Sequence, residues 1–341
     1  MAICLLLVGQ SGTATAAETL QRFEFLQIRM GIPVSLTVYG ADEQAANKAA
    51  RAAYARIREI DRIMSDYDPD SELMQLCRMS RAGHPVRVSD ELFYILSESV
   101  KHSRNTDGAF DVSIGPVVRL WRQTRRKREL PDPESLARAR ASVGFEAICL
   151  NREQQTVELR KSGMRLDLGG IAKGYAADEA RRVLAEHGLN RVLIDAGGDI
   201  VAGDPPPDRP AWIIAIQPLR SRDGESVQTL QLAEGAVATS GDAYQYVEIE
   251  GVRYSHIVDP ATGLGLTQSS SVTVIAPDGT TADSLASALS VLGPEDGLKL
   301  IEQTKGVEAL IVVAGPDGPV AHASSGFDRY RSRTAADDAA R

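Results

Sequence analysis

Short runs of apolar residues, separated by turn-forming residues, fill most of the second half of this chain. Runs of this length bounded by Gly, Pro, Asn or Asp are typical of β-strands. Strands are expected over residues 22–29, 34–39, 147–150, 156–159, 192–194, 212–217, 229–232, 236–240, 244–250, 252–258, 271–276, 307–313 and 319–323. The pair around Glu250-Gly251 is typical of a hairpin. Because strands and helices do not alternate regularly, the sequence predicts an α+β fold: a largely antiparallel mixed sheet with flanking helices.

The flanking helices are indicated by apolar residues at helical spacing and by capping residues at their starts. In the helix expected over residues 42–65, small and apolar residues recur at helical spacing after Asp42, which is a suitable N-cap. Proline at a first helical position, as at Pro133 and Pro294, is also typical of a helix start. Helices are expected over residues 42–65, 90–104, from 115 onward, 132–141, 171–187, 281–292 and 294–303.

The two ends of the chain differ from the rest. Residues 2–8 are a short apolar run, and Ala14-Thr15-Ala16 has the small-residue pattern of a signal cleavage site. We therefore expect residues 1–16 to be a secretory signal, although a basic start is missing. Residues 17–330 are expected to form the folded domain, and the polar residues 331–341 a frayed tail. This organisation predicts an exported, periplasmic protein, with association with the inner membrane as a variant.

Charge and cysteine content exclude several classes of function. The chain has 38 Lys and Arg against 46 Asp and Glu, a formal net charge of −8, which argues against non-specific binding to nucleic acid. No apolar run reaches the roughly 18 residues that a membrane-spanning helix needs. Beyond the expected signal, only Cys77 and Cys149 occur, too few for a disulfide framework, and we expect free thiols.

The stretch RLDLGGIAKGYAAD at residues 165–178 combines a strand-like segment, two glycines and a helix start. Glycines allow close approach of a ligand to the backbone, and a helix start offers unpaired N–H groups. Asp167 and Lys173 lie on either side of Gly169-Gly170, so the stretch suits a polar, anionic ligand. Its spacing matches neither the dinucleotide-binding nor the P-loop fingerprint. A simple joint between strand and helix explains the local pattern equally well.

Asp283, Ser287 and His256 are further candidates for chemistry. Asp283 and Ser287 are four residues apart on an expected helix, where a carboxylate and a hydroxyl can share a hard cation such as Mg²⁺. The helix dipole alone also favours an acid at that place. His256, at the end of an expected strand, can act as a general base or be structural. Tyr67 and Phe110 lie in loops bordered by aspartates, where an aromatic face can stack on a ring or anchor packing.

Taken together, these stretches resemble the ApbE family of FAD:protein FMN transferases. The resemblance covers most of the chain after residue 16, and its motifs occur in the family's order. They are Met30-Gly31, Ser65-Asp66-Tyr67 with DSEL at 70–73, DGAFD at 107–111 leading to Gly115-Pro116, LDLGGIAKGYAAD at 166–178, DAGGD at 195–199, SHIVDPATG at 255–263, SVTVIAP at 271–277 and ADSLASALSVLG at 282–293. No single motif is specific, but chance does not explain eight of them in order.

The resemblance implies Mg²⁺-dependent transfer of FMN from FAD to a threonine or serine hydroxyl of a client flavoprotein, with AMP leaving. The client would be a subunit of a membrane redox complex. The implied fold is ApbE-like or T-fold-like, with the option of two lobes around a flavin cleft. The residues that match flavin-nucleotide contacts are Met30, Tyr67, Ala109, Phe110, Asp111, Asp167, Lys173 and Val258. The metal ligands would be the Gly170 carbonyl, the Asp283 carboxylate and the Ser287 hydroxyl, and His256 or a nearby aspartate would act on the client hydroxyl.

Three positions depart from the family pattern. Ile32 replaces a threonine, which removes a hydroxyl next to the flavin, and Ala261 replaces an arginine in the Asp-Pro turn. Ser287 stands where the family has a threonine; it keeps the metal-binding oxygen but lacks the methyl group that restricts its rotamers.

On the sequence alone, two other functions fit the same residues. An FAD pyrophosphatase would use the same metal site with water as the acceptor, and it would release FMN and AMP without a client. A non-catalytic periplasmic FAD carrier would need the binding loops but not the metal site.

Overall fold

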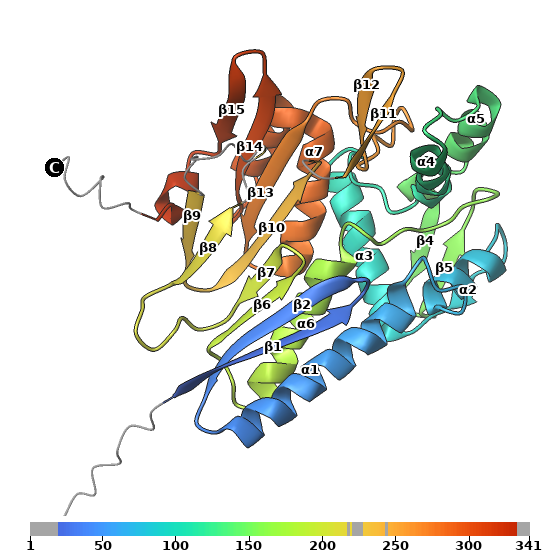
Figure 1. The fold of residues 1–341 in the computed structure, drawn as a ribbon. Coiled ribbons are helices and arrows are strands. Elements are labelled where there is room, and N and C mark those ends of the chain that lie inside the picture. Colours follow the sequence, from blue (N-terminus) through green and yellow to red (C-terminus); the bar gives the residue numbers. More distant parts are fainter. Residues whose placement is uncertain (1–19, 217–218, 220–227, 243–244, 333–341) are drawn as a thin grey trace, which may run out of the picture.

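The computed structural model describes residues 20–216, 219, 228–242 and 245–332 (Figure 1). Its centre is an eight-stranded sheet in the order β1-β2-β6-β7-β10-β13-β14-β15, in which each neighbouring pair is antiparallel. The α+β class with a largely antiparallel sheet is therefore confirmed. The strands of this sheet are β1 (Gln21–Arg29), β2 (Ile32–Gly40), β6 (Val192–Ala196), β7 (Asp199–Ala202), β10 (Gly235–Gly241), β13 (Ser270–Ala276), β14 (Glu308–Gly315) and β15 (Gly318–Ala323).

The remaining strands form three small sheets, ordered β3-β5-β4, β8-β9 and β11-β12. They are β3 (Val86–Arg87), β4 (Ile148–Asn151), β5 (Thr156–Leu159), β8 (Trp212–Ile216), β9 (Gln228–Leu232), β11 (Tyr246–Ile249) and β12 (Val252–Ser255). The helices are α1 (Glu43–Met64), α2 (Glu72–Met79), α3 (Asp90–Asn105), α4 (Gly115–Lys127), α5 (Pro133–Ala141), α6 (Ala172–Glu186) and α7 (Gly279–Glu302), with 3₁₀ turns η1 (Phe145–Ala147) and η2 (Phe327–Tyr330).

Most of the expected elements are present, and the differences have local causes. α2 was not expected from the sequence, because an eight-residue helix is too short for a clear period; Ser71 caps it by accepting a hydrogen bond from Met74 N. β7 was also missed, since the two glycines of DAGGD suggested a loop where they form a hairpin turn. α7 begins at Gly279 rather than at 281, with Asp278 as its N-cap, and its φ/ψ break at Gly293 separates the two expected helices.

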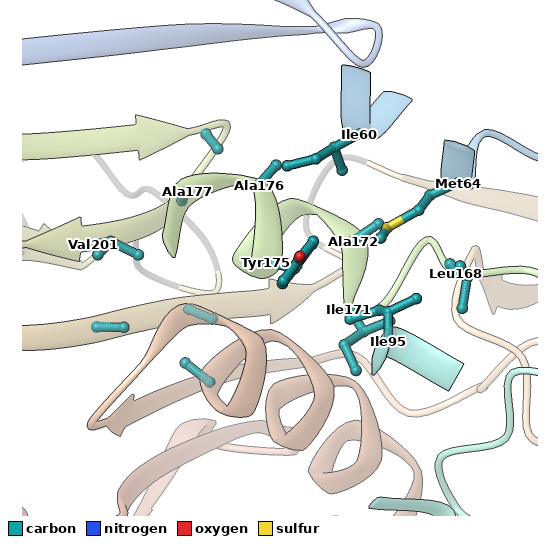
Figure 2. Packing of buried hydrophobic residues seen from close by; sticks show 14 of the residues in the cluster. Ile60, Met64, Ile95, Leu168, Ile171, Ala172, Tyr175, Ala176, Ala177 and Val201 are labelled. Atoms are coloured by element: carbon teal, nitrogen blue, oxygen red, sulfur yellow. The ribbon is translucent and has the colours of Figure 1, made fainter. Parts of the chain in front are cut away.

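The main core lies between the sheet and helices α1, α6 and α7. Figure 2 shows Ile60 and Met64 of α1 and Ile95 of α3 gathered around Ile171 and the first turns of α6. All of these side chains are almost completely buried. Part of the opposite face of the sheet is covered by the β8–β9 pair and η2, in a second cluster of buried residues that includes Trp212 and Phe327. The start of α6 is thus held rigidly in the middle of the molecule.

Two glycines let α6 and α7 come unusually close. A Cβ added at Gly174 would stand 2.0 Å from the carbonyl oxygen of Gly279, so only glycine fits the crossing. Asp178 of α6 then accepts hydrogen bonds from the backbone N–H groups of Gly279 (2.7 Å) and Thr280 (2.9 Å) at the start of α7. These bonds satisfy N–H groups that a helix start leaves unpaired. The crossing places the start of α6 beside the first two turns of α7.

A smaller cluster joins α4 and α5 to the β11–β12 hairpin. Val117 and Trp121 of α4 are buried against Val247, Ile249 and Val258. The indole N–H of Trp121 donates to the carbonyl oxygen of Ser255 at 2.9 Å, at the end of β12. This contact fixes the segment that carries His256. Cys77 and Cys149 are free thiols, as expected.

Within the described residues, no helix has both the length and the apolar character needed to cross a bilayer. The expected signal at residues 1–16 and most of the expected tail at 331–341 lie outside the described residues.

Candidate active site

A cavity of about 580 Å³ opens where the start of α6, the β6–β7 turn, the end of β10, the segment after β12 and the middle of α7 meet. Its volume is in the range of ligand pockets for small molecules and cofactors. Nearly all site residues predicted from the sequence line it: Tyr67, Ala109, Phe110, Asp111, Asp167, Gly170, Lys173, His256, Val258, Asp283 and Ser287. These residues come from separate parts of the chain, so their convergence is a property of the fold.

Met30 is the exception, because it is not among the residues that line the cavity. It lies in the turn between β1 and β2, where Met30 (φ 51°) and Gly31 (φ 74°) both have left-handed backbone angles. The neighbouring Ile32 reaches the β6–β7 turn: its Cδ1 is 3.0 Å from the position of a Cβ at Gly197, which does line the cavity. Met30 is therefore close in sequence to the rim, and its nucleotide contact stays a prediction.

Lys173 is held by two buried carboxylates on the cavity wall. Its Nζ donates to Asp283 Oδ1 at 2.9 Å and to Asp199 Oδ2. The carboxylates are 5% and 7% exposed and the lysine side chain 29%. Asp283 Oδ2 also accepts from the backbone N–H of Gly174, at 3.2 Å. The lysine therefore acts on the cavity together with these two acids.

The protonation states of Lys173 and Asp199 follow from their burial and from the charges beside them. Burial alone would lower the pKa of Lys173, but the attraction of Asp283 and Asp199 outweighs it and raises the pKa above its ordinary value. The ammonium is therefore charged at neutral pH. Burial and the nearby Asp283 raise the pKa of Asp199 to about 7, although Lys173 works against that rise. Protonation of Asp199 near neutral pH thus sets the net charge of this wall.

Asp283, Ser287 and Gly170 form a set of oxygen donors that suits Mg²⁺. Asp283 and Ser287 share one face of α7, and Ser287 Oγ lies 2.8 Å from the position that a Cβ would take at Gly170. The hydroxyls of Ser284 and Ser290 both bond to carbonyl oxygens of their own helix at 2.9 Å. Among described residues the Ser287 hydroxyl has no such partner, so it is available to a ligand. Carboxylate, hydroxyl and backbone carbonyl are donors that hard cations prefer.

No cluster of three or more His, Cys, Asp or Glu residues in the described part of the chain is arranged to hold a metal ion. The candidate donor set contains one carboxylate, that of Asp283. The same turn of α7 carries no second acid. That composition is typical of Mg²⁺ sites, which use few protein ligands and complete their shell with substrate phosphates and water.

Arg122 links Asp167 to the mouth of the cavity. Its guanidinium donates to Asp167 Oδ2 at 3.1 Å and to Asp66 Oδ2, and it stacks on the ring of Tyr67 with 4.1 Å between Cζ and the ring centroid. Tyr67 is 77% exposed, so this stack holds an otherwise free aromatic ring at the entrance. Asp167 also accepts from Gly169 N at 2.8 Å, which shapes the glycine turn. Burial raises the pKa of Asp167, and Asp66 adds to the rise.

Phe110 and Asp111 also line the cavity. Phe110 is 6% exposed, and its Cε2 lies 3.4 Å from a Cβ position at Gly170, so the ring packs against the glycine turn. The two carboxylate oxygens of Asp111 accept from the backbone N–H groups of Ser113 (2.8 Å) and Phe145 (3.0 Å). Asp111 therefore stabilises this loop as well as lining the cavity. Burial raises the pKa of its carboxyl.

His256 has the hydrogen bonding expected of a base. Its Nδ1 lies 3.2 Å from the carbonyl oxygen of Gln245. A carbonyl only accepts, so Nδ1 carries the proton and Nε2 of the neutral ring is left with a free lone pair. Burial lowers the pKa of His256, which keeps the ring neutral at neutral pH. Since His256 lines the cavity, Nε2 is available to accept a proton there.

Three residues of the site were not singled out from the sequence. Asp199 belonged to a recognised acidic motif, but nothing local indicated that it meets Lys173, 26 residues away. Arg122 and Gln245 had no signal, since an arginine in a basic helix and a glutamine in a loop are common at any surface. Only the fold shows that one orders Tyr67 and the other orients His256.

The ApbE family matches residues 30–311 of this chain, which includes every residue of the cavity described above. Proteins named FAD:protein FMN transferase are similar over most of their length. The one from Treponema pallidum is 31% identical over 345 residues, covering 96% of this chain and 94% of that protein. The one from Vibrio cholerae is 34% identical over 281 residues, covering 81% and 83%.

Solved structures agree with the sequence comparison. The crystal structure of the ApbE protein from Thermotoga maritima superposes with a TM-score of 0.82 at 30% identity, covering 92% of this chain and 100% of that one. The flavin transferase ApbE from Vibrio cholerae superposes with a TM-score of 0.81 at 29% identity, again covering 92% and 100%. The similarity of structure therefore extends over most of the chain.

Proposed function

The chain belongs to the ApbE family, and from this premise we propose how it transfers FMN from FAD to a client protein. It is a transferase that uses FAD as a substrate. The observation that carries the proposal is that one cavity is lined both by the oxygen donors of Asp283, Ser287 and Gly170, beside the Lys173 ion pair, and by His256. This combination supplies charge neutralisation and a base, the two needs of phosphoryl transfer.

We propose that the enzyme depends on Mg²⁺, held by the Gly170 carbonyl, the Asp283 carboxylate and the Ser287 hydroxyl. The support is the donor chemistry and the Ser287 hydroxyl, which has no hydrogen-bond partner among the described residues. When bound, the ion would neutralise charge on the pyrophosphate of FAD. Asp283 would hold it while remaining hydrogen-bonded to Gly174 N, and Lys173 would keep Asp199 and Asp283 from repelling the nucleotide.

In the proposed reaction, a threonine or serine hydroxyl of the client attacks the phosphorus on the FMN side of the pyrophosphate. One P–O bond forms to the client oxygen, and the P–O bond to the bridging oxygen breaks, so that AMP leaves. The hydroxyl proton passes to Nε2 of His256, which the Gln245 carbonyl orients through Nδ1. Phe110 and Tyr67 provide aromatic faces for the rings of FAD, one buried and one at the entrance.

We further propose that the protein is exported to the periplasm and acts there on a flavoprotein subunit of a membrane redox complex. The support is the apolar run at residues 2–8 with the small residues that follow it, and the family's need for a protein client. Fractionation of cells that express the full chain, with N-terminal sequencing of the product, tests this. Recovery of the uncleaved chain in the cytosol would refute it.

The transfer itself is tested by incubating a candidate client fragment with the enzyme, FAD and Mg²⁺, followed by mass spectrometry. The expected result is a covalent FMN phosphoryl adduct on a threonine or serine, lost when Mg²⁺ is chelated or when Asp283→Ala replaces the wild type. The same assay without client separates a hydrolase: rapid release of AMP and free FMN would contradict the transferase. FAD binding unaffected by either change, without any adduct, would indicate a carrier.

A further inference from the structure

A second hollow of about 990 Å³ opens beside the cavity and shares Tyr67, Arg122 and Arg125 with it. We call it the arginine groove, after the six arginines that line it: Arg119, Arg122, Arg125, Arg126, Arg128 and Arg165. Its other side includes Tyr246, Val247 and Glu248 of β11. Figure 1 shows α4 and the β11–β12 hairpin on the same side of the molecule. The groove is therefore continuous with the active site.

The charge of the groove is opposite to that of the protein. Six arginines face two acidic residues there, whereas the whole chain has a net charge of −8. Arg122 is paired with Asp66 and Asp167. In the described part of the chain, no carboxylate lies within 4.0 Å of the guanidinium nitrogens of Arg119, Arg125, Arg126 or Arg128. A concentration of unpaired guanidinium groups in a hollow attracts an anionic partner.

The dipole of helix α4 accounts for only some of the arginines in the groove. Basic residues in the last turn of α4, such as Arg125 and Arg126, are favoured by the helix dipole. Arg119, however, lies in the first half of α4, and Arg165 comes from the segment before α6. Because arginines from different elements converge on one hollow, the dipole does not explain the groove.

We propose that the arginine groove docks an acidic segment of the client polypeptide and directs its hydroxyl into the active site. This inference rests on the proposed function, which requires two substrates. The 580 Å³ cavity has the size for the nucleotide, so a second, adjoining hollow is available for the protein. Guanidinium forks match carboxylates in bidentate geometry, and the exposed ring of Tyr67 lies between the two hollows.

The proposal is tested by binding, without any need for transfer. Two labelled peptides of about twelve residues, each with one threonine, would be compared by fluorescence anisotropy with FAD and Mg²⁺ present; one carries about four aspartates, which the other replaces by asparagine. We expect the acidic peptide to bind the wild type at least about tenfold more tightly, with strong dependence on salt. The variant Arg126→Glu with Arg128→Glu should abolish that preference, while lysine at both positions should restore most of it.

A matched control uses Arg51 and Arg58, exposed arginines of α1, which has no part in the groove. Glutamate at these two positions changes the net charge equally and should leave the preference for the acidic peptide intact. Equal binding of both peptides to the wild type would overturn the proposal. So would an FAD affinity that falls in step with peptide affinity, since the groove would then belong to the nucleotide. Absence of FMN transfer would refute the proposed function and leave these binding constants unchanged.

Discussion

Replacing Lys173 by methionine would leave two buried carboxylates without their shared cation. Asp199 and Asp283 are 7% and 5% exposed, and both bond to the ammonium. Breaking a buried ion pair by removal of one partner typically costs about 3–5 kcal/mol, because the other charge stays desolvated. We expect Lys173→Met to lower the free energy of unfolding by about that amount at about pH 8. FAD affinity should fall as well, since the wall of the cavity becomes more negative.

The size of the effect should depend on pH through Asp199. Its pKa is about 7 in the folded wild type, well above the ordinary value of about 3.9. When folding raises the pKa of a carboxyl, the free energy of unfolding falls as the pH rises from the unfolded pKa to the folded pKa. Above the folded pKa it falls no further on account of this group. Without the ammonium the folded pKa of Asp199 rises further, so the variant continues to lose stability above about pH 7. The deficit is therefore expected to be larger at about pH 8 than at about pH 6.

Urea unfolding followed by tryptophan fluorescence provides the measurement, because Trp121 and Trp212 are both buried in the folded state. A suitable control is Lys299→Met. Lys299 is 61% exposed and pairs with two surface acids, so its loss should cost less than about 1 kcal/mol. An unfolding free energy equal to that of the wild type, with FAD binding lost, would refute this reasoning and make Lys173 a direct ligand of the nucleotide. A deficit independent of pH would refute the role given to Asp199.

Three other changes test separate parts of the site. His256→Gln should slow transfer by about 10²–10⁴-fold with FAD affinity unchanged, and it should remove the acid limb expected below about pH 6.5 in the wild-type rate profile; full activity would exclude the histidine as base. Ser287→Ala should change the unfolding free energy by less than about 0.5 kcal/mol but raise the Mg²⁺ concentration needed for turnover, whereas Ser287→Thr should not; an unchanged Mg²⁺ titration would contradict the ligand role. Gly174→Ala forces a methyl group to within 2.0 Å of the Gly279 carbonyl and should cost at least about 1–3 kcal/mol in thermal unfolding, so wild-type stability would disprove the close crossing.

Local patterns in the sequence were sufficient to predict much of the fold. The hairpin at Glu250-Gly251, the N-cap at Asp42 and the helix that starts at Pro133 are each indicated by neighbouring residues, and each is present. The same holds for Asp283 and Ser287, whose spacing alone places them on one face of α7. Where the local signal was short or ambiguous, as for α2 and β7, prediction failed.

By itself, the sequence determined the fold class, through periodicity and capping. The order of its motifs, through their resemblance to one family, indicated most of the residues that line the cavity. The tertiary structure alone decided what those residues touch. Lys173 bonds to Asp283, which is 110 residues away in the sequence, and to Asp199, which is 26 residues away. These contacts depend on the close packing of α6 against α7 at Gly174, since a side chain at Gly174 would hold the helices apart. In the same way, α4 alone looks like a solvated basic helix, and it becomes one wall of a groove only because Trp121 fixes it to the segment that carries His256. Such contacts are set by long-range packing, on which the local order of residues carries no information.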